Sequence, residues 1–345
     1  MMLSVFKNLK KLSLSSTTPI TCLVSGGIDS MTLLEILFRY QKEIGNLSLT
    51  VLHFNHHLRG AESNRDAAFV KQEAAARGFD CLVVDLPLIK GSGIQNRARD
   101  LRRQKLQELS GQKGWSLAFL AHHADDQVET VLMHLLRGAA LKGLKGMEMV
   151  CALRSNHFLG SCLRHTSSVV DSPRAVTLFL VRPLLEVTRQ EITDFVRTQG
   201  ISFVEDSSNG KKAYWRNQIR YDTLPEIRKY FPDLTRTIQR SCRQLQREYR
   251  LFCQEAESFL KKTEDTWTGR GNYFRLEETS RFLVLSQLIH QAGFEKEFLS
   301  RHFEEIEDLL KKEKEVKREY GRAALETSGP FFRFVSMPSL SLVNE

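Results

Sequence analysis

Residues 20–30, I-T-C-L-V-S-G-G-I-D-S, decide how the rest of the chain is interpreted. The apolar start predicts a short strand, the two glycines predict a tight turn, and the apolar spacing from Met31 to Phe38 predicts a helix. Glycine lets the backbone curl around a ligand, and Ser30 is expected to cap a helix whose free N–H groups point at the same place. The stretch therefore predicts a phosphate-binding loop, with an ordinary strand-to-helix turn as the alternative.

The loop also indicates which phosphate ligand it binds. It lacks the G-x-x-x-x-G-K-[ST] pattern, so no lysine neutralises the phosphates, and Asp29 would repel them unless a divalent cation lay between. We therefore expect a nucleotide and Mg²⁺, with Asp29 as the metal ligand. The string S-G-G-x-D-S resembles the PP-loop of the ATP pyrophosphatases, which implies ATP and an adenine nucleotide alpha hydrolase-like fold. The residues expected to bind the nucleotide here are Ser25, Gly26, Gly27, Ile28, Asp29 and Ser30.

Length and composition limit the class of protein. A chain of 345 residues predicts two domains, and 50 Lys+Arg against 41 Asp+Glu give a formal charge of +9, which favours nucleic acid or a membrane surface as partner. None of the six cysteines forms a C-x-x-C pair, which argues against a zinc ribbon, an iron–sulfur site or disulfides and favours the cytoplasm. No apolar run approaches the roughly 18 residues of a membrane span. The start of the chain, residues 1–18, is basic and Ser-rich, as a transit peptide would be, but this bias is also common without targeting.

The first half of the sequence alternates strand and helix patterns, which predicts an α/β fold with a parallel sheet covered on both faces. We expect this domain to span residues 1–215 and a smaller helical domain to span residues 216–345. Helix-start boxes are predicted at residues 63–66 and 188–191. The expected strands lie near 20–24, 48–54, 80–84 and 116–121, and the expected helices near 30–44, 63–77 and 95–112.

Ligands of parallel sheets gather at the carboxyl ends of the strands, so residues after each strand are candidates. His53 and Arg59 follow the second strand and could bind the nucleotide, although each alone is also an ordinary loop residue. The third helix carries a run of basic residues that includes Arg99 and Arg103. Such a run is usually a solvated face, but here one or two arginines could reach the site.

The fourth strand runs into H-H-A-D-D-Q-V-E-T, residues 122–130. One of Asp125 and Asp126 is expected to cap the following helix, which leaves the other for chemistry as a magnesium ligand or a proton acceptor. His122 could donate to developing charge or position a phosphate. Catalytic zinc is less consistent with hard carboxylates around a nucleotide. The basic, glycine-spaced stretch 137–147, with Arg137 and Lys142, could fold over a substrate or simply connect elements.

Four segments in fixed order are similar to the tRNA(Ile)-lysidine synthetases, the wobble-cytidine-modifying branch of the PP-loop enzymes. The first is shared by the whole superfamily, and the other three together are specific to this branch. The resemblance covers roughly residues 20–225. The segments are S-G-G-I-D-S (25–30), H-H-A-D-D-Q-V-E-T (122–130) with the glycine-spaced stretch 137–147, R-P-L-L (182–185), and E-D-S-S-N (205–209) followed by R-N-Q-I-R (216–220).

The resemblance implies a C–N bond-forming ligase that uses ATP, Mg²⁺, free lysine and the isoleucine tRNA with a CAU anticodon. The cytidine oxygen would attack the α-phosphorus of ATP, and lysine would then displace AMP to give lysidine. By the same resemblance, Asp29, His122, Asp126 and Arg99 would be catalytic. The residues implied to contact the tRNA or the nucleotide are Arg103, Arg137, Lys142, Arg182, Arg216, Asn217 and Arg220.

Two other readings stay open. Another PP-loop activity would be tRNA thiolation, amide synthesis on NAD or GMP, or argininosuccinate formation, but thiolation usually needs paired or catalytic cysteines. An RNA-binding protein with a vestigial loop is the alternative outside enzymes, and the intact Asp29 and Asp126 argue against it. The sequence leaves the oligomeric state open, with a homodimer as one alternative.

Two further features lie outside the motifs. Residues 148–176 form a longer join than is usual in the family, and their basic, Ser-rich composition predicts a mobile flap. In the second domain a helix is expected from about Asp233 to Lys262, with an arginine ridge opposite an apolar stripe that packs on helices near 278–293 and 298–312. We expect the ridge to bind tRNA phosphates, chiefly through Arg240, Arg243 and Arg247. The ridge consists of Arg236, Arg240, Arg243, Arg247 and Arg250.

Overall fold

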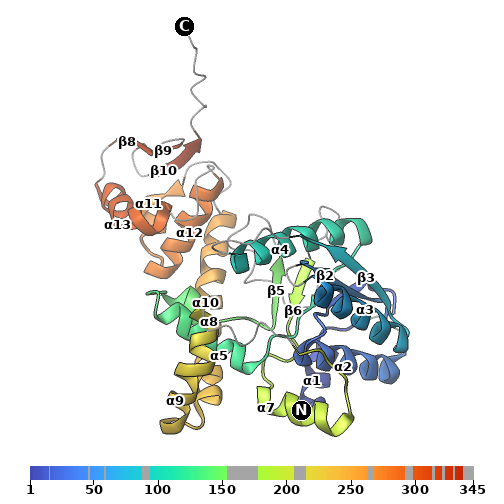
Figure 1. The fold of residues 1–345 in the computed structure, drawn as a ribbon. Coiled ribbons are helices and arrows are strands. Elements are labelled where there is room, and N and C mark those ends of the chain that lie inside the picture. Colours follow the sequence, from blue (N-terminus) through green and yellow to red (C-terminus); the bar gives the residue numbers. More distant parts are fainter. Residues whose placement is uncertain are drawn as a thin grey trace. The chain divides into compact units, whose positions relative to one another are not determined.

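In the computed structural model the chain folds into two compact units, one formed by the described residues up to Gln246 and the other from Arg247 onward (Figure 1). Among the described residues no helix is both long enough and apolar enough to cross a bilayer. The structure describes residues 1–14, 16–45, 47–57, 60–87, 94–153, 178–205, 215–262, 268–291, 298–312, 315–320, 323–328 and 331–336.

The first unit is built on a six-stranded sheet with the order β3-β2-β1-β4-β6-β5. The pairings β1 with β2, β1 with β4, β2 with β3 and β4 with β6 are parallel, and only the edge strand β5 runs antiparallel to its neighbour. The expected parallel α/β sheet is thus confirmed. The strands are β1 (Ile20–Leu23), β2 (Leu49–Asn55), β3 (Asp80–Asp85), β4 (Leu117–Phe119), β5 (Val150–Leu153) and β6 (Leu178–Val181).

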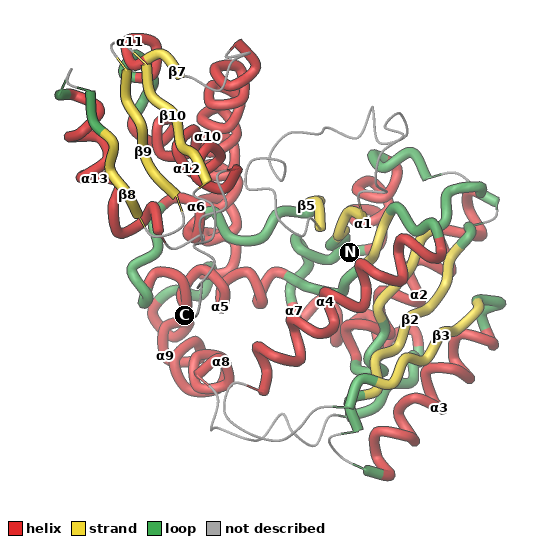
Figure 2. The backbone as a smooth tube through the Cα atoms, turned by 90° about the horizontal axis from the view of Figure 1, so that it is seen from above, coloured by secondary structure: helices red, strands yellow, loops and turns green. Residues whose placement is uncertain are grey.

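Helices cover both faces of this sheet because the strand side chains alternate between two cores. Val51 of β2 and Phe119 of β4 belong to the larger core, together with residues of α1, α2, α3 and α7. Leu52 and Ala118, each one residue away, belong to the smaller core beneath α4. The helices are α1 (Met2–Lys10), α2 (Ile28–Ile44), α3 (Ala61–Ala76), α4 (Ile94–Lys113) and α7 (Arg189–Gln199), and Figure 2 shows α3 beside β2 and β3.

The strand order places a topological switch between β1 and β4. From β1 the chain passes to β2 and β3 on one side, and then returns to β4 on the other side of β1. In open parallel sheets such a switch leaves a crevice at the carboxyl ends of the two central strands, where ligands bind. The glycine loop at residues 25–29 and the H-H-A-D-D segment follow β1 and β4, so both flank this crevice.

The rest of the first unit is helical. A π-helical turn, η3, lies between α8 and α9, and such turns often mark functional sites. The first turns of α10 pack through Leu234 and Ile238 on a cluster centred on Val128 and Leu224. These elements are α5 (Ala124–Leu135), α6 (Leu141–Leu144), α8 (Trp215–Gln218), η3 (Ile219–Thr223), α9 (Leu224–Tyr230) and α10 (Leu234–Lys262).

The second unit combines helices with a small antiparallel sheet of order β7-β10-β9-β8. Tyr273 is fully buried at its centre, where its hydroxyl donates to Glu307 (2.9 Å) and its ring packs on Phe332. The elements are β7 (Thr268–Gly269), α11 (Arg270–Tyr273), α12 (Glu278–Gln291), α13 (Phe298–Lys311), β8 (Lys317–Tyr320), β9 (Ala323–Ser328) and β10 (Phe331–Ser336).

Several expectations need correction. The start of the chain, for which no helix was expected, forms α1, whose Val5 and Leu9 are fully buried in the core. Helix α3 begins at Ala61, before the box predicted at residues 63–66, because the turn at Gly60 leads directly into the helix. Within the apolar stripe of α10, Ile238 packs in the first unit, where no contact was expected. Further along the helix, Phe252 O accepts the hydroxyl of Ser280 in α12 (3.3 Å), in line with the expected packing on a later helix.

The expected flap at residues 148–176 also differs in part. Its start is the edge strand β5, which pairs with β6, so these residues are regular structure. The remainder, from residue 154, lies outside the described residues, and its expected mobility stays a prediction.

Candidate active site

The glycine loop after β1 forms a compact turn. Gly26 has φ +92°, a backbone conformation that residues with a Cβ rarely adopt, so this position favours glycine. The backbone N–H of Val204 donates to Gly26 O (2.9 Å) and closes the turn from the other side. Gly27, by contrast, has an ordinary φ of −73° and is the N-cap of α2.

Ser30 lies inside the first turn of α2 and does not cap it, contrary to expectation. Its hydroxyl donates to Gly27 O (2.9 Å) and accepts the N–H of Ser25 (3.2 Å). It therefore ties the two ends of the loop together, while the exposed Ser25 and the half-buried Asp29 remain at the mouth of the crevice.

The second half of the site is the start of α5, where Asp126 closes the N-terminus. Its Oδ2 accepts the backbone N–H of His123 (3.1 Å), the N-cap residue. Its Oδ1 accepts Nη2 of Arg216 (3.1 Å) and Nη2 of Arg220 (2.9 Å). Burial raises the pKa of Asp126, but the nearby His123, His122 and Arg216 outweigh it and lower that pKa, so the carboxylate is ionised.

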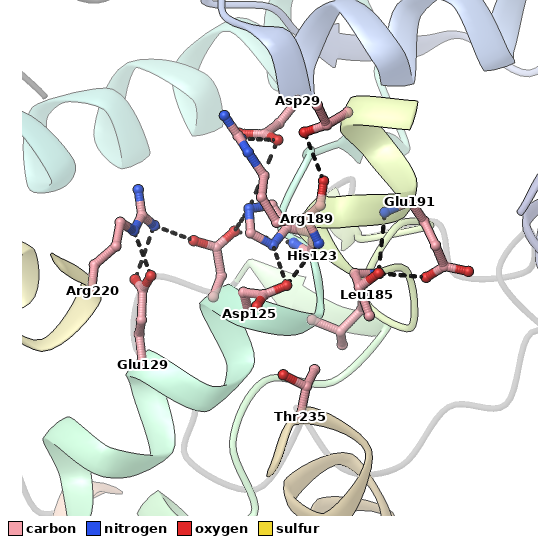
Figure 3. Close-up of polar contacts among 12 residues, drawn as sticks. Asp29, His123, Asp125, Glu129, Leu185, Arg189, Glu191, Arg220 and Thr235 are labelled. Atoms are coloured by element: carbon pink, nitrogen blue, oxygen red, sulfur yellow. Dashed lines mark hydrogen bonds and ion pairs between the residues drawn. The ribbon is translucent and has the colours of Figure 1, made fainter. Parts of the chain in front are cut away.

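Glu129 completes this cluster one turn further along α5, with its side chain 1% exposed. It accepts Nε of Arg216 (2.7 Å) and Nη2 of Arg220 (2.9 Å), as Figure 3 shows for Arg220. Burial lowers the pKa of Arg220, but hydrogen bonding to Glu129 outweighs it and raises that pKa well above its usual value. The two arginines are therefore firmly paired, and they fix Asp126 in place.

His122 lies among Arg182, Arg216 and Arg99, whose charges act on its ring. Arg182, only 7% exposed, donates Nε to His122 Nδ1 (3.3 Å) and Nη1 to Glu148 O (2.9 Å). Burial, followed by the charge of Arg182, lowers the pKa of His122 to about 3. Because Nδ1 accepts, the neutral ring carries its proton on Nε2 and can donate from there.

Positive charge accumulates around His122. The pKa of Arg99 is lowered first by burial and then by the charges of Arg216, Arg182 and Arg103. Guanidinium groups that depress one another's pKa in this way create a local potential that favours an anion such as a phosphate.

A third group of contacts joins α2, α5 and α7. Arg189 at the start of α7 pairs with the Asp29 carboxylate, and His123 Nε2 lies 3.8 Å from Asp29 Oδ1. The backbone N–H of Arg189 donates to Asp125 Oδ2 (2.7 Å), and Arg228 of α9 pairs with Asp125 Oδ1. His123 Nδ1 is buried and has no hydrogen-bond partner among the described residues, so this contact remains for a ligand or water. Figure 3 shows Asp29, His123, Asp125 and Arg189 converging.

The stretch after α5 is not a loose loop. Met147 N donates to Gln127 Oε1 (2.7 Å), and Met147 O accepts both Gln127 Nε2 (2.9 Å) and Gln246 Nε2 (2.9 Å). Arg137 and Lys142 are exposed on this stretch. The segment is therefore a connector that is fixed at Met147, and its contact with a substrate stays a prediction.

Other predicted residues lie as follows. His53 is buried and its Nδ1 contacts Val24 O (2.8 Å), so it supports the backbone just before the glycine loop. Arg103 is exposed on α4, and Asn217 is half-buried on α8. Arg59 and the E-D-S-S-N residues 206–209 lie outside the described residues. Arg240, Arg243 and Arg247 are exposed on α10, as the spacing predicted.

The sequence motifs did not indicate three residues of the site, Glu129, Arg189 and Arg228. Glu129 could have been found, because it follows Asp126 by three residues on one helical face, and Arg216 and Arg220 have the matching spacing of four. Arg189 and Arg228 gave no such signal, because their partners, Asp29 and Asp125, lie 160 and 103 residues away in the sequence.

The thiols of the described residues are mostly unreactive. Burial raises the pKa of Cys22 and Cys81, and it raises the pKa of Cys242 to about 11, so these thiols stay protonated. Cys151 lies near the site, where no cysteine was expected, because its Sγ accepts a hydrogen bond from Arg182 Nη1 (3.2 Å).

A family model described as the PP-loop domain matches residues 2–227. The chain belongs to the PP-loop family. In this family's ATP-binding domain the glycine loop of residues 25–30 is the signature that the sequence predicted, so use of ATP follows from membership. Curated relatives named tRNA(Ile)-lysidine synthase include one from Parabacteroides distasonis, 32% identical over 288 residues, and one from Bacillus subtilis, 33% identical over 298 residues.

These relatives match 81% and 84% of this chain, whereas the chain covers only 58% and 56% of their own length. The chain thus spans somewhat more than half the length of these curated relatives. Among solved structures, the U34-tRNA thiolase NcsA from Methanococcus maripaludis with its 4Fe-4S cluster superposes with a TM-score of 0.56 at 20% identity, over 71% of this chain and 77% of that one. That likeness supports the PP-loop fold alone.

One residue of the site, Asp29, is suited to bind Mg²⁺. Asp29 supplies a partly exposed carboxylate at the mouth of the crevice. No cluster of three or more potential protein ligands occurs among the described residues. A single carboxylate completed by phosphate oxygens and water is the ligand set in which Mg²⁺ is usually held.

Proposed function

We propose that the chain catalyses ATP-dependent ligation of lysine to the 2-position of the wobble cytidine in the tRNA(Ile) that has a CAU anticodon. One observation carries the proposal: segments from four distant parts of the sequence meet at the switch between β1 and β4. Asp29, the pair His122 and Asp126, Arg182 and Arg216 represent the four motifs of the lysidine synthetases. Contacts join these motifs: His123 Nε2 lies 3.8 Å from Asp29 Oδ1, Arg182 donates to His122, and Arg216 pairs with Asp126. The names of the curated relatives support the same activity.

The chemistry requires activation of a poor leaving group. The cytidine oxygen would attack the α-phosphorus of ATP, pyrophosphate would leave, and AMP would depart when the ε-amine of lysine adds at the same carbon. This requires charge neutralisation on the phosphates, in-line placement and a proton acceptor. The amides of the Gly26 loop and the cations near His122 can neutralise charge, and Nε2–H of His122 can donate to a phosphate oxygen.

Asp29 would hold Mg²⁺ if Arg189 gave up its present pairing. The ion would supply further neutralisation of phosphate charge. Arg189, released from the Asp29 carboxylate, would then itself be near the phosphates, because it starts α7 beside the loop.

Asp126 is the proposed acceptor for the amine proton, and its present ion pairs with two arginines limit its strength as a base. With two guanidinium groups attached its pKa is low, and a carboxylate of low pKa is a weak base. Phosphates would compete for Arg216 and Arg220. Their partial transfer to the nucleotide would raise the pKa of Asp126 and strengthen it as a base when ATP is bound.

The arginine ridge of α10, defined above, is the proposed contact with the RNA backbone. Residues 211–250 contain 11 Lys+Arg and 4 Asp+Glu, so they supply 11 − 4 = +7 of the chain's +9. Arg240 is exposed and makes no ion pair among the described residues, and Arg243 has only Glu186 at 3.3 Å. Such side chains can bind phosphates without reading the sequence.

Labelled lysine tests the function directly. The protein is incubated with ATP, labelled lysine and either tRNA(Ile) with the CAU anticodon or tRNA(Met) with the same anticodon. We expect label only in tRNA(Ile). Label in neither RNA, together with pyrophosphate release on another acceptor, would assign the chain to a different PP-loop activity. No tRNA-dependent pyrophosphate release at all would favour an RNA-binding protein.

A further inference from the structure

The tip between α9 and α10 exposes two adjacent aromatic side chains. Tyr230, the last residue of α9, is 79% exposed, and Phe231, the C-cap residue of that helix, is 64% exposed. A turn that only met solvent would not need them, since two exposed aromatic rings leave a large apolar area in water. The tip is where α9 meets the start of α10 in Figure 1.

The tip is anchored to the active site. Arg228, two residues before Tyr230, pairs with Asp125 of the site and donates to Thr235 Oγ1 of α10 (3.3 Å). The N–H of Leu234 donates to Phe231 O (3.0 Å), which fixes the turn itself. The two rings therefore project from a rigid support within roughly one helical turn, about 5 Å along the axis, of a residue that contacts the site.

The charge around the tip favours RNA over a second copy of the chain as its partner. From Glu226 to Arg243 the chain holds five Arg and Lys residues and two acids, Glu226 and Asp233. A second copy of the chain would bring like charges together, which disfavours this tip as a dimer contact. Aromatic rings interleaved with cations are typical of surfaces that bind unpaired nucleotides, where rings stack on bases and cations hold phosphates.

We propose that Tyr230 and Phe231 stack on unpaired bases of the RNA loop that contains the reacting cytidine. This proposal rests on the proposed function. It adds that the part of the RNA bound by the tip is a single-stranded loop, next to the nucleotide that enters the site. The ridge on α10, which continues from the tip, would hold the phosphates of the adjoining stem.

The test compares two RNA probes, a hairpin with the CAU anticodon loop and a blunt duplex of equal length. Tyr230→Ala with Phe231→Ala should weaken binding of the hairpin about tenfold or more, leave its salt dependence unchanged, and alter binding of the duplex less than about twofold. Tyr230→Trp with Phe231→Trp should restore hairpin binding. Leu3→Ala, which removes another exposed apolar side chain (86% exposed), should change neither.

Three results would overturn the proposal. They are unchanged hairpin affinity in the double alanine variant, equal loss for hairpin and duplex, and a dimeric wild-type protein that the variant converts to monomers. The lysine assay separates this proposal from the function. If the protein cannot transfer lysine but still binds the RNA loop through the two rings, the proposed stacking surface is supported and the proposed ligase activity is rejected.

Discussion

Two groups of arginines in this molecule look alike in sequence and differ in structure. Three arginines of the active site contact carboxylates: Arg216 and Arg220 contact Asp126 and Glu129, and Arg189 contacts Asp29. On the α10 ridge, Arg236 has only a loose contact with Asp233 at 3.7 Å, and Arg240 has no ion pair among the described residues.

The difference indicates two roles for the same side chain. A paired guanidinium near a buried carboxylate fixes geometry, because separating it would leave a charge without a partner in a poorly solvated place. An exposed guanidinium among like charges gains by meeting a polyanion, since that relieves repulsion and releases counterions. We therefore expect changes in the site to affect chemistry and changes on the ridge to affect RNA affinity.

The largest effect is expected for Asp126→Asn. It removes the proposed proton acceptor and also weakens the anchor of Arg216 and Arg220, so lysine transfer should fall about 100-fold or more. Labelled-lysine incorporation at saturating ATP measures this. Asp194→Asn, an exposed carboxylate on α7, is the matched control and should retain activity. Normal turnover by Asp126→Asn would reject its role.

The next effect concerns the ridge. Replacing Arg240, Arg243 and Arg247 by glutamine should weaken tRNA binding and lower the slope of log K against log salt by roughly 0.7–0.9 for each lost phosphate contact. ATP affinity should not change. Arg197→Gln, which removes an 80% exposed arginine from α7, should leave the slope intact. An unchanged slope in the triple variant would make the ridge an ordinary solvated surface.

Part of the fold and of the site could be predicted from the sequence, and part could not. Strands β1 to β4 and helices α2, α3 and α4 were predicted to within a few residues, because alternation and helical spacing are local signals. Helix α1 and strand β6 were not predicted. The antiparallel strand β5 and the sheet β7–β10 were missed, since short, partly charged strands such as Lys317–Tyr320 carry no clear alternation and depend on distant partners. In the site, motifs located Asp29, His122 and Asp126, but which arginine meets which acid required the fold.

A moderate effect is expected on the pH dependence of stability. Burial and Arg182 lower the pKa of His122 to about 3 in the folded state, against about 6.5 when unfolded. A lowered pKa favours the neutral ring, so this contribution to stability is complete above about pH 6.5 and is lost as the pH falls towards 3. Urea unfolding across this range should show a shallower loss for His122→Asn than for wild type.

Nuclear magnetic resonance of the histidine ring provides the direct check on that interpretation. The His122 signal should stay in its neutral position from pH 8 to pH 5, roughly two units above its lowered pKa. A midpoint near the usual value would show that the ring is not buried among cations, and it would remove His122 as a neutral donor in the site.

The smallest effect concerns the connector after α5. Gly146 has φ +66°, and an added Cβ would lie 2.7 Å from Gln127 Nε2, an atom held by Met147 O. Gly146→Ala should cost about 3 kcal/mol of unfolding free energy, from backbone strain and lost hydrogen bonds. Gly138→Ala, at φ +72° with nothing within 4 Å, isolates the strain and should cost about 1 kcal/mol. Equal costs would contradict the fixed connector.

The division between the two groups of arginines is tested most directly by the rate of lysine transfer as tRNA is raised to saturation. The account predicts that the triple glutamine variant of Arg240, Arg243 and Arg247 reaches the wild-type rate once enough tRNA is present, whereas Asp126→Asn stays slow at every concentration. A triple variant that remains slow at saturation, or an Asp126→Asn protein that recovers, would contradict the account.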